Sequence, residues 1–462
     1  MADTSDLEWR RFPTAVGILL GTSLCFHLGA LIEIAFGTRF AAATWFLCGQ
    51  FAISIGLLRL YDGKWMFQDI RLFLVIFLFL YGATLPLVVA SGLGGIQAGL
   101  TGATFMYATA FLGFNLVQWW YKQPFHDVPK EVWWRIKPTI WNAVFLIGMF
   151  AFILLYAARL GIRISLTIDR GLVGLLGTQL WVVLMFAANG FVMYMVAGWS
   201  RLTRSARIAL AITVVVFIVF QLAMGNRRDF LPMLIFIAGI VATRRQSTIR
   251  LGALIIGFLA FAAFTAIGIV RQVIRDPSVL TRFNPVEILV TQNEFVSPIY
   301  TLMHYVNVDR PLRWGITYLS APTLFIPRAI WPSKPESLSL QFMRDAFGTT
   351  GLMGFAYTPI TEAFLNFWYV GPFIVFTILS LALVKLVKNA DAHPGLYFVA
   401  FALVVDFNRG DWGGTFYSLT VVGGAYWFMT VVSRLRWASS RVSSIWPSDQ
   451  APATEPAMPP RA

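Results

Sequence analysis

Long apolar runs follow one another along most of the chain, with short polar segments between them. A helix that crosses about 30 Å of hydrocarbon at 1.5 Å per residue needs about 20 apolar residues, and most of these runs reach that length. The pattern predicts an all-α, polytopic integral membrane protein with about 12 transmembrane helices. The predicted helices lie at residues 13–36, 40–60, 71–93, 101–121, 138–158, 172–199, 208–225, 230–243, 251–270, 363–387, 395–408 and 413–433.

Two of these runs are shorter than a straight span requires. We therefore expect the helices at 230–243 and 395–408 to be tilted, broken or re-entrant. The first run, in contrast, is too long for the core of a signal peptide, and acidic residues precede it. We expect it to be retained as the first transmembrane helix.

The composition agrees with a membrane protein. Hydrophobic residues make up 58% of the 462 residues and charged residues 13%, whereas soluble domains average about 45–50% and about 25%. The 17 Trp residues suit helix ends at a lipid–water interface. Cys25 and Cys48 both lie within apolar runs, and the chain has no Cys/His spacing that is typical of a zinc site.

The distribution of charge predicts the orientation in the membrane. If the N-terminus is inside, the inner segments hold 21 of the 36 Lys and Arg residues, and the short outer segments hold seven. This asymmetry predicts that both termini are cytoplasmic. The net charge of +14 does not indicate nucleic-acid binding, because the chain has no basic hydrophilic domain to carry it.

One long outer segment, residues 271–361, separates helices 1–9 (residues 1–270) from helices 10–12 (residues 362–434). We predict that it folds as a cap, with a helix at 285–306 followed by proline-rich extended or turning backbone. Residues 435–462 form a cytoplasmic tail whose composition predicts disorder. The aromatic residues of the cap that can form a small core are Trp314, Tyr318, Phe325, Trp331, Phe342 and Tyr357.

The outer segments are rich in arginine. They carry 14 Arg and one Lys, against 15 Arg and six Lys on the inside. A guanidinium is a planar, always-charged fork that binds phosphate oxygens in pairs, so this bias suits a site for a lipid diphosphate. A single arginine can instead bind a lipid headgroup or pair with a nearby acid.

Two short clusters place basic residues at defined points of the outer side. Gly225–Asp229 is a tight turn between two apolar runs, so its arginines lie at or just below the interface. The prolines of Pro327–Pro335 fix the backbone around its basic residues. An ordinary charged hairpin turn and a rigid scaffold for the cap are the alternatives. The basic residues of the two clusters are Arg227, Arg228, Arg328 and Lys334.

Two further clusters carry acids. Glu362–Phe367 opens the tenth helix, where a carboxylate can act in catalysis or simply stabilise the helix dipole. Asn408–Asp411 forms another tight outer turn. No metal is predicted, because metal-binding motifs are missing, and the chain lacks a phosphate-binding loop for nucleotides. The candidate general bases are Glu362, Glu294, His304 and Asp411.

In their order along the chain, these motifs resemble the bacterial O-antigen (Wzy-type) repeat-unit polymerases. The resemblance covers residues 220–415 motif by motif. It rests on a Gly-x-Arg-x-x-x-Leu-like element at Gly225–Leu231, Pro-Arg-x-x-Trp-Pro-x-Lys-Pro at 327–335, Glu-x-x-x-Asn-Phe…Gly at Glu362–Gly371, and Arg-Gly-Asp at 409–411.

The resemblance implies a GT-C-like glycosyltransferase of the bacterial inner membrane that needs no cofactor. Its substrate would be an undecaprenyl-diphosphate-linked oligosaccharide, polymerised at the periplasmic face in lipopolysaccharide or exopolysaccharide biosynthesis. Its partners would be membrane lipid, a chain-length co-polymerase and a repeat-unit flippase. Glu362, then Glu294, would act as base. The diphosphate would be bound by Arg227, Arg228, Arg328 and Arg409, with Arg271 and Lys334 as second choices.

Two alternatives stay open at this point. An O-antigen ligase would perform the same chemistry on a lipid A–core acceptor and would be expected to use a histidine of the outer loop, which His304 could supply. A flippase or transporter of lipid-linked oligosaccharide would carry charges at mid-membrane depth. Most charges of this chain are instead predicted at helix ends.

Overall fold

The structure of the protein is a computed structural model, and all of its regular elements are helical in the part that it describes. It describes residues 14–62, 66, 68–92, 95–125, 136–159, 178–223, 230–245, 278, 295–326, 330–348 and 356–434.

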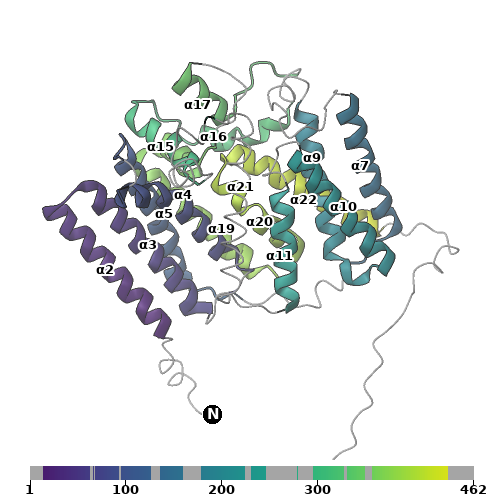
Figure 1. Cartoon of the computed structure of the whole chain (residues 1–462), viewed down its shortest axis with the longest axis horizontal. Coiled ribbons are helices and arrows are strands. Elements are labelled where there is room, and N and C mark those ends of the chain that lie inside the picture. The colour runs from purple at the N-terminus through teal and green to yellow at the C-terminus, as the bar shows by residue number, and fades with distance from the viewer. Residues whose placement is uncertain are drawn as a thin grey trace, which may run out of the picture.

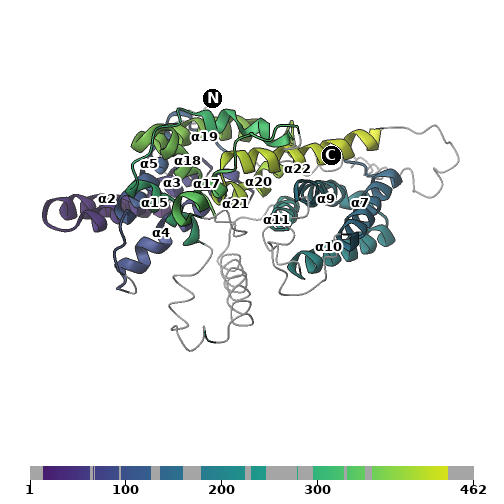
Figure 2. The same ribbon diagram turned by 90° about the horizontal axis from the view of Figure 1, so that it is seen from above.

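The helices form two groups that lie side by side (Figures 1 and 2). In the first group α2 packs on α3, α3 on α5, and α5 on α19. In the second group α9 packs against α7, α11 and α22, while α20 and α21 join the two groups. The first group comprises α2 (Thr14–Phe36), α3 (Arg39–Asp62), α4 (Ile70–Ala90), α5 (Leu100–Tyr121) and α19 (Gly371–Lys388). The second comprises α7 (Ile140–Arg159), α9 (Thr178–Ala197), α10 (Arg204–Ala223), α11 (Leu231–Arg245) and α22 (Trp412–Arg434).

Short helices lie at one end of the bundle, which we call the cap face (Figure 1). These helices are short because prolines and glycines interrupt the chain there. The other end is called the opposite face. The short helices near the cap face are α15 (Ser297–Asn307), α16 (Ile316–Leu319), η3 (Ala321–Phe325), α17 (Leu338–Phe347) and α18 (Pro359–Phe367).

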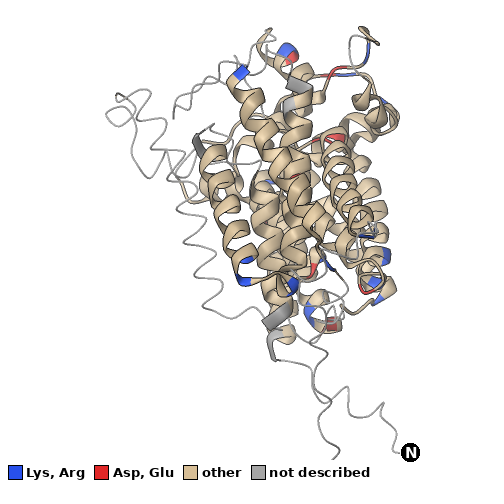
Figure 3. Ribbon diagram, turned by 90° about the vertical axis from the view of Figure 1, so that its right-hand side faces the viewer, with Lys and Arg blue, Asp and Glu red and all other residues tan. Residues whose placement is uncertain are grey.

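Eight helices among the described residues are long and apolar enough to cross a membrane, as expected for a polytopic membrane protein. Apolar side chains cover their outer surfaces, and most charged residues lie toward the helix ends (Figure 3). Two shorter apolar helices, Val182–Ala197 and Leu231–Thr243, add to these. Of the twelve predicted runs, only the one at 251–270 lies outside the described residues.

Two predicted helices are broken in the structure. The run at 395–408 forms α20 (Pro394–Ala402) and α21 (Val404–Asn408), in agreement with its expected irregularity. The predicted single helix at 363–387 is wrong in detail, because α18 begins earlier and a 3-10 turn, η4 (Trp368–Val370), separates it from α19. Trp368 there has a φ of 59°, which an apolar run does not reveal.

The cap also differs from its prediction. Among the residues expected to form a helix at 285–306, α15 begins only at Ser297, and 285–294 lie outside the described residues. Phe342 and Tyr357 are buried as predicted. Trp314, in contrast, is 75% exposed, and Phe325 and Trp331 are also exposed, so these three do not belong to a cap core.

Interhelical hydrogen bonds hold α2, α3 and α5 together within their apolar surroundings. The Ser54 hydroxyl donates to Asn115 Oδ1 at 2.6 Å, and Asn115 Nδ2 donates to Gln50 Oε1 at 3.0 Å. Gln50 Nε2 lies 3.0 Å from His27 Nε2 on α2. Such polar contacts are a common means of joining membrane helices, because hydrophobic burial gives little drive for association in lipid.

At the opposite face, Arg71 is fully buried and connects the ends of three helices. Its Nη2 lies 3.1 Å from Asp62 Oδ1 and 2.8 Å from Asp69 Oδ2. Nε also donates to Asp69, and Nη1 donates to Gln118 Oε1 and the Gln123 carbonyl at 3.2 and 2.6 Å. Every guanidinium nitrogen therefore has a protein partner.

Candidate functional site

The candidate site is built around α18, which carries Glu362. Thr358 caps this helix by accepting a hydrogen bond from the Ile360 N–H, and Pro359 occupies the first turn, where a proline is tolerated. The Tyr107 hydroxyl of α5 donates to the Thr358 hydroxyl at 3.1 Å. The start of α18 is therefore fixed to the first group of helices.

The Glu362 carboxylate is held from two sides. Oε1 accepts a hydrogen bond of 2.7 Å from the Thr317 hydroxyl of α16. Oε2 accepts one of 2.5 Å from the backbone N–H of Trp412, at the start of α22. The side chain is only 1% exposed. Segments that are far apart in the sequence thus fix the direction of this carboxylate.

The other end of α18 is joined to the segment before α16. The backbone N–H groups of Arg313 and Trp314 donate to the carbonyls of Leu365 and Asn366 at 3.0 and 3.2 Å. These carbonyls would otherwise be unsatisfied at a helix C-terminus. Gly315, with a φ of +82°, then donates its N–H to Asn366 Oδ1 at 2.8 Å. The backbone of Arg313 is therefore docked directly on the helix that carries Glu362.

Asp411 lies beside this centre but has structural contacts. Its Oδ1 accepts the Gly414 N–H at 2.7 Å and thereby caps the start of α22. Its Oδ2 accepts the Leu338 N–H at 3.2 Å, at the start of α17. Asp411 and Arg313 are both near enough for their charges to act on Glu362. The centre therefore contains one negative and one positive neighbour.

Two tyrosine hydroxyls near Glu362 are buried and have no hydrogen-bond partner among the described residues, those of Tyr318 and Tyr357. Burial, followed by the charge of Glu362, raises the pKa of Tyr318. Burial also raises the pKa of Tyr357, with smaller contributions from Tyr305 and Glu362. Both groups are therefore protonated donors at neutral pH, available to a hydroxyl or oxyanion of a ligand.

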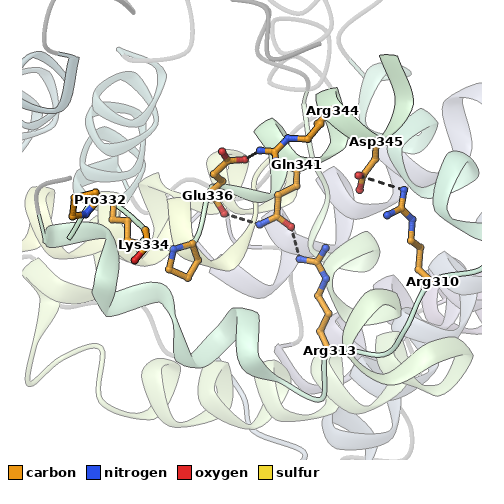
Figure 4. A pocket seen from close by; sticks show the side chains of 10 residues that line it. Arg310, Arg313, Pro332, Lys334, Glu336, Gln341, Arg344 and Asp345 are labelled. Atoms are coloured by element: carbon orange, nitrogen blue, oxygen red, sulfur yellow. Dashed lines mark hydrogen bonds and ion pairs between the residues drawn. The ribbon is translucent and has the colours of Figure 1, made fainter. Parts of the chain in front are cut away.

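A polar pocket of about 480 Å³ lies at the cap face, and Arg313 lines it. Figure 4 shows Arg310, Arg313 and Arg344 around it, contributed by α17 and the segment before α16. Arg310 pairs with Asp345 at 3.3 Å, and Arg344 pairs with Glu336. The remaining lining residues are Pro332, Ser333, Lys334, Pro335 and Gln341.

Of the predicted site residues, Glu362 lies at the centre and Asp411 next to it. Arg409 is half-buried, and its carbonyl accepts the Tyr357 N–H at 3.2 Å. Lys334 lines the pocket, but its buried Nζ donates to the carbonyls of Leu324 and Ile326. The predicted residues that lie outside the described residues are Arg227, Arg228, Arg271, Arg328 and Glu294.

His304 is half-buried on α15, and its ring packs edge-on against Phe342, with ring centres 5.4 Å apart. Its Nε2 is buried and has no hydrogen-bond partner among the described residues. Burial and the charge of Arg310 lower the pKa of His304, and Asp345 opposes this shift. The ring is therefore neutral at pH 7 and close to two of the charged residues that line the pocket.

Sequence reasoning did not single out the three pocket arginines. The positive-inside rule does not count residues of long loops, so Arg310, Arg313 and Arg344 remained undistinguished among eight basic residues. Thr317 and Tyr318 were also missed as neighbours of Glu362. The Arg-Pro-Leu-Arg spacing at 310–313 was the available signal, because two arginines flank a proline that restricts the backbone.

No group of three or more His, Cys, Asp or Glu side chains in the described part of the chain could hold a metal ion. Comparison with models of protein families, with curated proteins and with solved structures gives no match to this chain.

Proposed function

We propose that the protein polymerises undecaprenyl-diphosphate-linked oligosaccharide repeat units. It would transfer the glycan of one lipid-linked molecule to a hydroxyl of another, at the periplasmic face of the bacterial inner membrane. The observation that carries this proposal is the position of Glu362. A buried, doubly held carboxylate lies on the same short helix that anchors an arginine of a polar pocket at the cap face.

The chemistry that this arrangement supports is glycosyl transfer. The acceptor hydroxyl would take the place of the Thr317 hydroxyl beside Glu362 and lose its proton to the carboxylate. Its oxygen would then form a bond to the anomeric carbon, while the bond from that carbon to the diphosphate breaks. The electron pair leaves with the diphosphate, whose growing negative charge fixed arginines stabilise. General base catalysis of this kind contributes about 10²–10⁴-fold in rate.

The proposed location follows from the charges at the helix ends. Arg59, Arg71, Lys122 and Lys385 all belong to ends of α3, α4, α5 and α19 at the opposite face. By the positive-inside rule, this face would be cytoplasmic and the cap face periplasmic. A lipid-linked substrate would then meet the site after a flippase has delivered it, and a co-polymerase would set the chain length.

A gel of surface polysaccharide from the source bacterium after deletion of the gene tests this function. Collapse of a long ladder to a single repeat on the lipid A core is the expected result. If repeats vanish from the core while long chains remain on the carrier lipid, the protein is instead a ligase. If unpolymerised repeats accumulate on the cytoplasmic side, it is a transporter.

A further inference from the structure

The three arginines of the cap-face pocket are not equivalent. Arg310 and Arg344 each have a carboxylate partner, Asp345 and Glu336 respectively. Arg313 has none among the described residues, although it lines the same pocket. Its Nη1 donates one hydrogen bond of 2.6 Å to Gln341 Oε1. A guanidinium has five N–H donors, so Arg313 keeps donors for a ligand.

The Arg313 side chain is also held in place before any ligand arrives. Its backbone N–H is bound to the Leu365 carbonyl at the end of α18. The Gln341 amide that receives its Nη1 donates in turn to the Glu336 carbonyl at 2.9 Å. Figure 4 shows this chain from Arg313 through Gln341 to Glu336. A fixed guanidinium binds an anion more tightly than a free one, because less conformational entropy is lost.

We propose that this pocket binds an oxyanion group of the lipid-linked glycan, with Arg313 as its principal ligand. The assignment of the oxyanion to a lipid-linked glycan rests on the proposed function, whereas the existence of an oxyanion site does not. The remaining N–H groups of Arg313 form the planar fork that receives a carboxylate or a phosphate through two parallel hydrogen bonds. The other two arginines of the pocket are already paired with carboxylates, in Arg310–Asp345 and Arg344–Glu336.

Two groups of the substrate offer this chemistry, the carboxylate of an acidic sugar and the diphosphate of the carrier. The position of the pocket favours the sugar. Its wall includes α17, which lies at the top of Figure 1, at the cap-face end of the bundle. Its volume of about 480 Å³ also exceeds what a single anion fills, and its lining is polar. An acidic monosaccharide within the repeat unit fits these features.

The test is direct binding to the purified, full-length protein in nanodiscs, measured by isothermal titration. The probes are a glucuronate-containing disaccharide, inorganic pyrophosphate and the neutral disaccharide cellobiose. We expect the acidic disaccharide to bind and cellobiose to bind at least about 10-fold more weakly, since a charge-assisted pair is lost. Tighter binding of pyrophosphate, with the same dependence on Arg313, would assign the oxyanion to the carrier instead of the sugar.

Arg313→Gln should weaken binding of the anionic probe by about 10–100-fold. Arg39→Gln, a matched change at the start of α3, should leave it unchanged. Gln341→Glu is the sharper variant, because it places a carboxylate of the same shape against Arg313. Its new ion pair with Arg313 should offset the lost hydrogen bond to the Glu336 carbonyl, so thermal stability should change little while anion binding is abolished. Unchanged binding in Arg313→Gln and Gln341→Glu, or failure of both anions to bind the unmodified protein, would overturn the proposal.

The same variants separate this site from the proposed function. If the deletion strain keeps its polysaccharide ladder while Arg313→Gln abolishes anion binding, the proposed polymerase activity is wrong and the oxyanion site stands. If the ladder collapses on deletion but anion binding is the same in both variants, the polymerase proposal stands and the oxyanion site is wrong.

Discussion

Arg71 at the opposite face and Arg313 at the cap face both lie near carboxylates at helix ends, but their surroundings differ. Arg71 is fully buried, and Asp62, Asp69 and the oxygens of two glutamines use all of its nitrogens. Among the described residues, the Arg313 side chain donates one hydrogen bond, to the neutral amide of Gln341, and it borders a pocket of about 480 Å³. The guanidinium of Arg71 is fully used in structural contacts, whereas that of Arg313 retains N–H donors.

This difference shows why a buried charge cannot be assigned a function from its burial alone. A buried ion pair is costly to desolvate, and it is stable only if every partner is satisfied. A network that meets this condition has nothing left to bind a ligand. At the cap face, in contrast, Tyr318 and Tyr357 still have unpartnered hydroxyls among the described residues. Incomplete satisfaction is therefore a feature that the candidate site has and the Arg71 network lacks.

The largest expected effect on stability is that of Arg71→Met. The substitution leaves Asp62 and Asp69 buried without their cation, and breaking a buried pair in this way costs about 3–5 kcal/mol. Thermal unfolding of the detergent-solubilised protein measures it. Arg313→Met, the same change at the cap face, should have a much smaller effect. Equal losses of stability in the two variants would mean that Arg313 also has a structural role.

Glu362→Gln should have the largest effect on activity. The amide keeps the shape of the side chain but cannot accept a proton, so chain elongation should fall by about 10²–10⁴-fold. Glu33→Gln, near the cap-face end of α2, is the matched control and should elongate normally. The measurement is the polysaccharide ladder at equal levels of membrane protein. A normal ladder from Glu362→Gln would exclude this carboxylate as the base.

The sequence predicts the long helices well and the site only in part. Runs such as 71–93 match α4 closely, because about 20 apolar residues are enough to specify a span. Glu362 could also be named as a candidate from its place in the chain. Its partners were not, since Thr317 and Trp412 lie 45 and 50 residues away and only tertiary packing brings them together. The pairing of Arg310 with Asp345 could not be predicted for the same reason.

Substitution of Asp411 should have a smaller effect, which distinguishes a structural role from a catalytic one. Its contacts with Gly414 and Leu338 are those of a helix cap, and asparagine caps a helix about as well as aspartate. Asp411→Asn should therefore keep most of the stability and elongation, whereas Asp411→Ala should lose about 1 kcal/mol of stability. The unfolding midpoints and ladders of the two variants are compared. Loss of elongation in Asp411→Asn at normal stability would make Asp411 a second essential acid.

The smallest expected effect is a change in pH dependence at His304. Burial and Arg310 lower the pKa of this ring in the folded protein, against a weaker opposing effect of Asp345. The unfolded chain, with an ordinary histidine pKa of about 6.5, therefore binds the proton more readily. The stability that this difference provides is fully present above about pH 6.5 and is lost as the pH falls from about 6.5 toward the lower pKa of the folded protein.

His304→Gln removes the group responsible for this loss. The unfolding midpoint should consequently fall less on acidification from pH 7.5 to 5.5 in the variant than in the unmodified protein. Carboxylates also titrate in this range, but they contribute equally to both proteins, so the difference between the two curves isolates His304. Parallel curves would show that Arg310 and burial do not act on this ring, and that its neighbours in the folded cap are more hydrated than its packing against Phe342 implies.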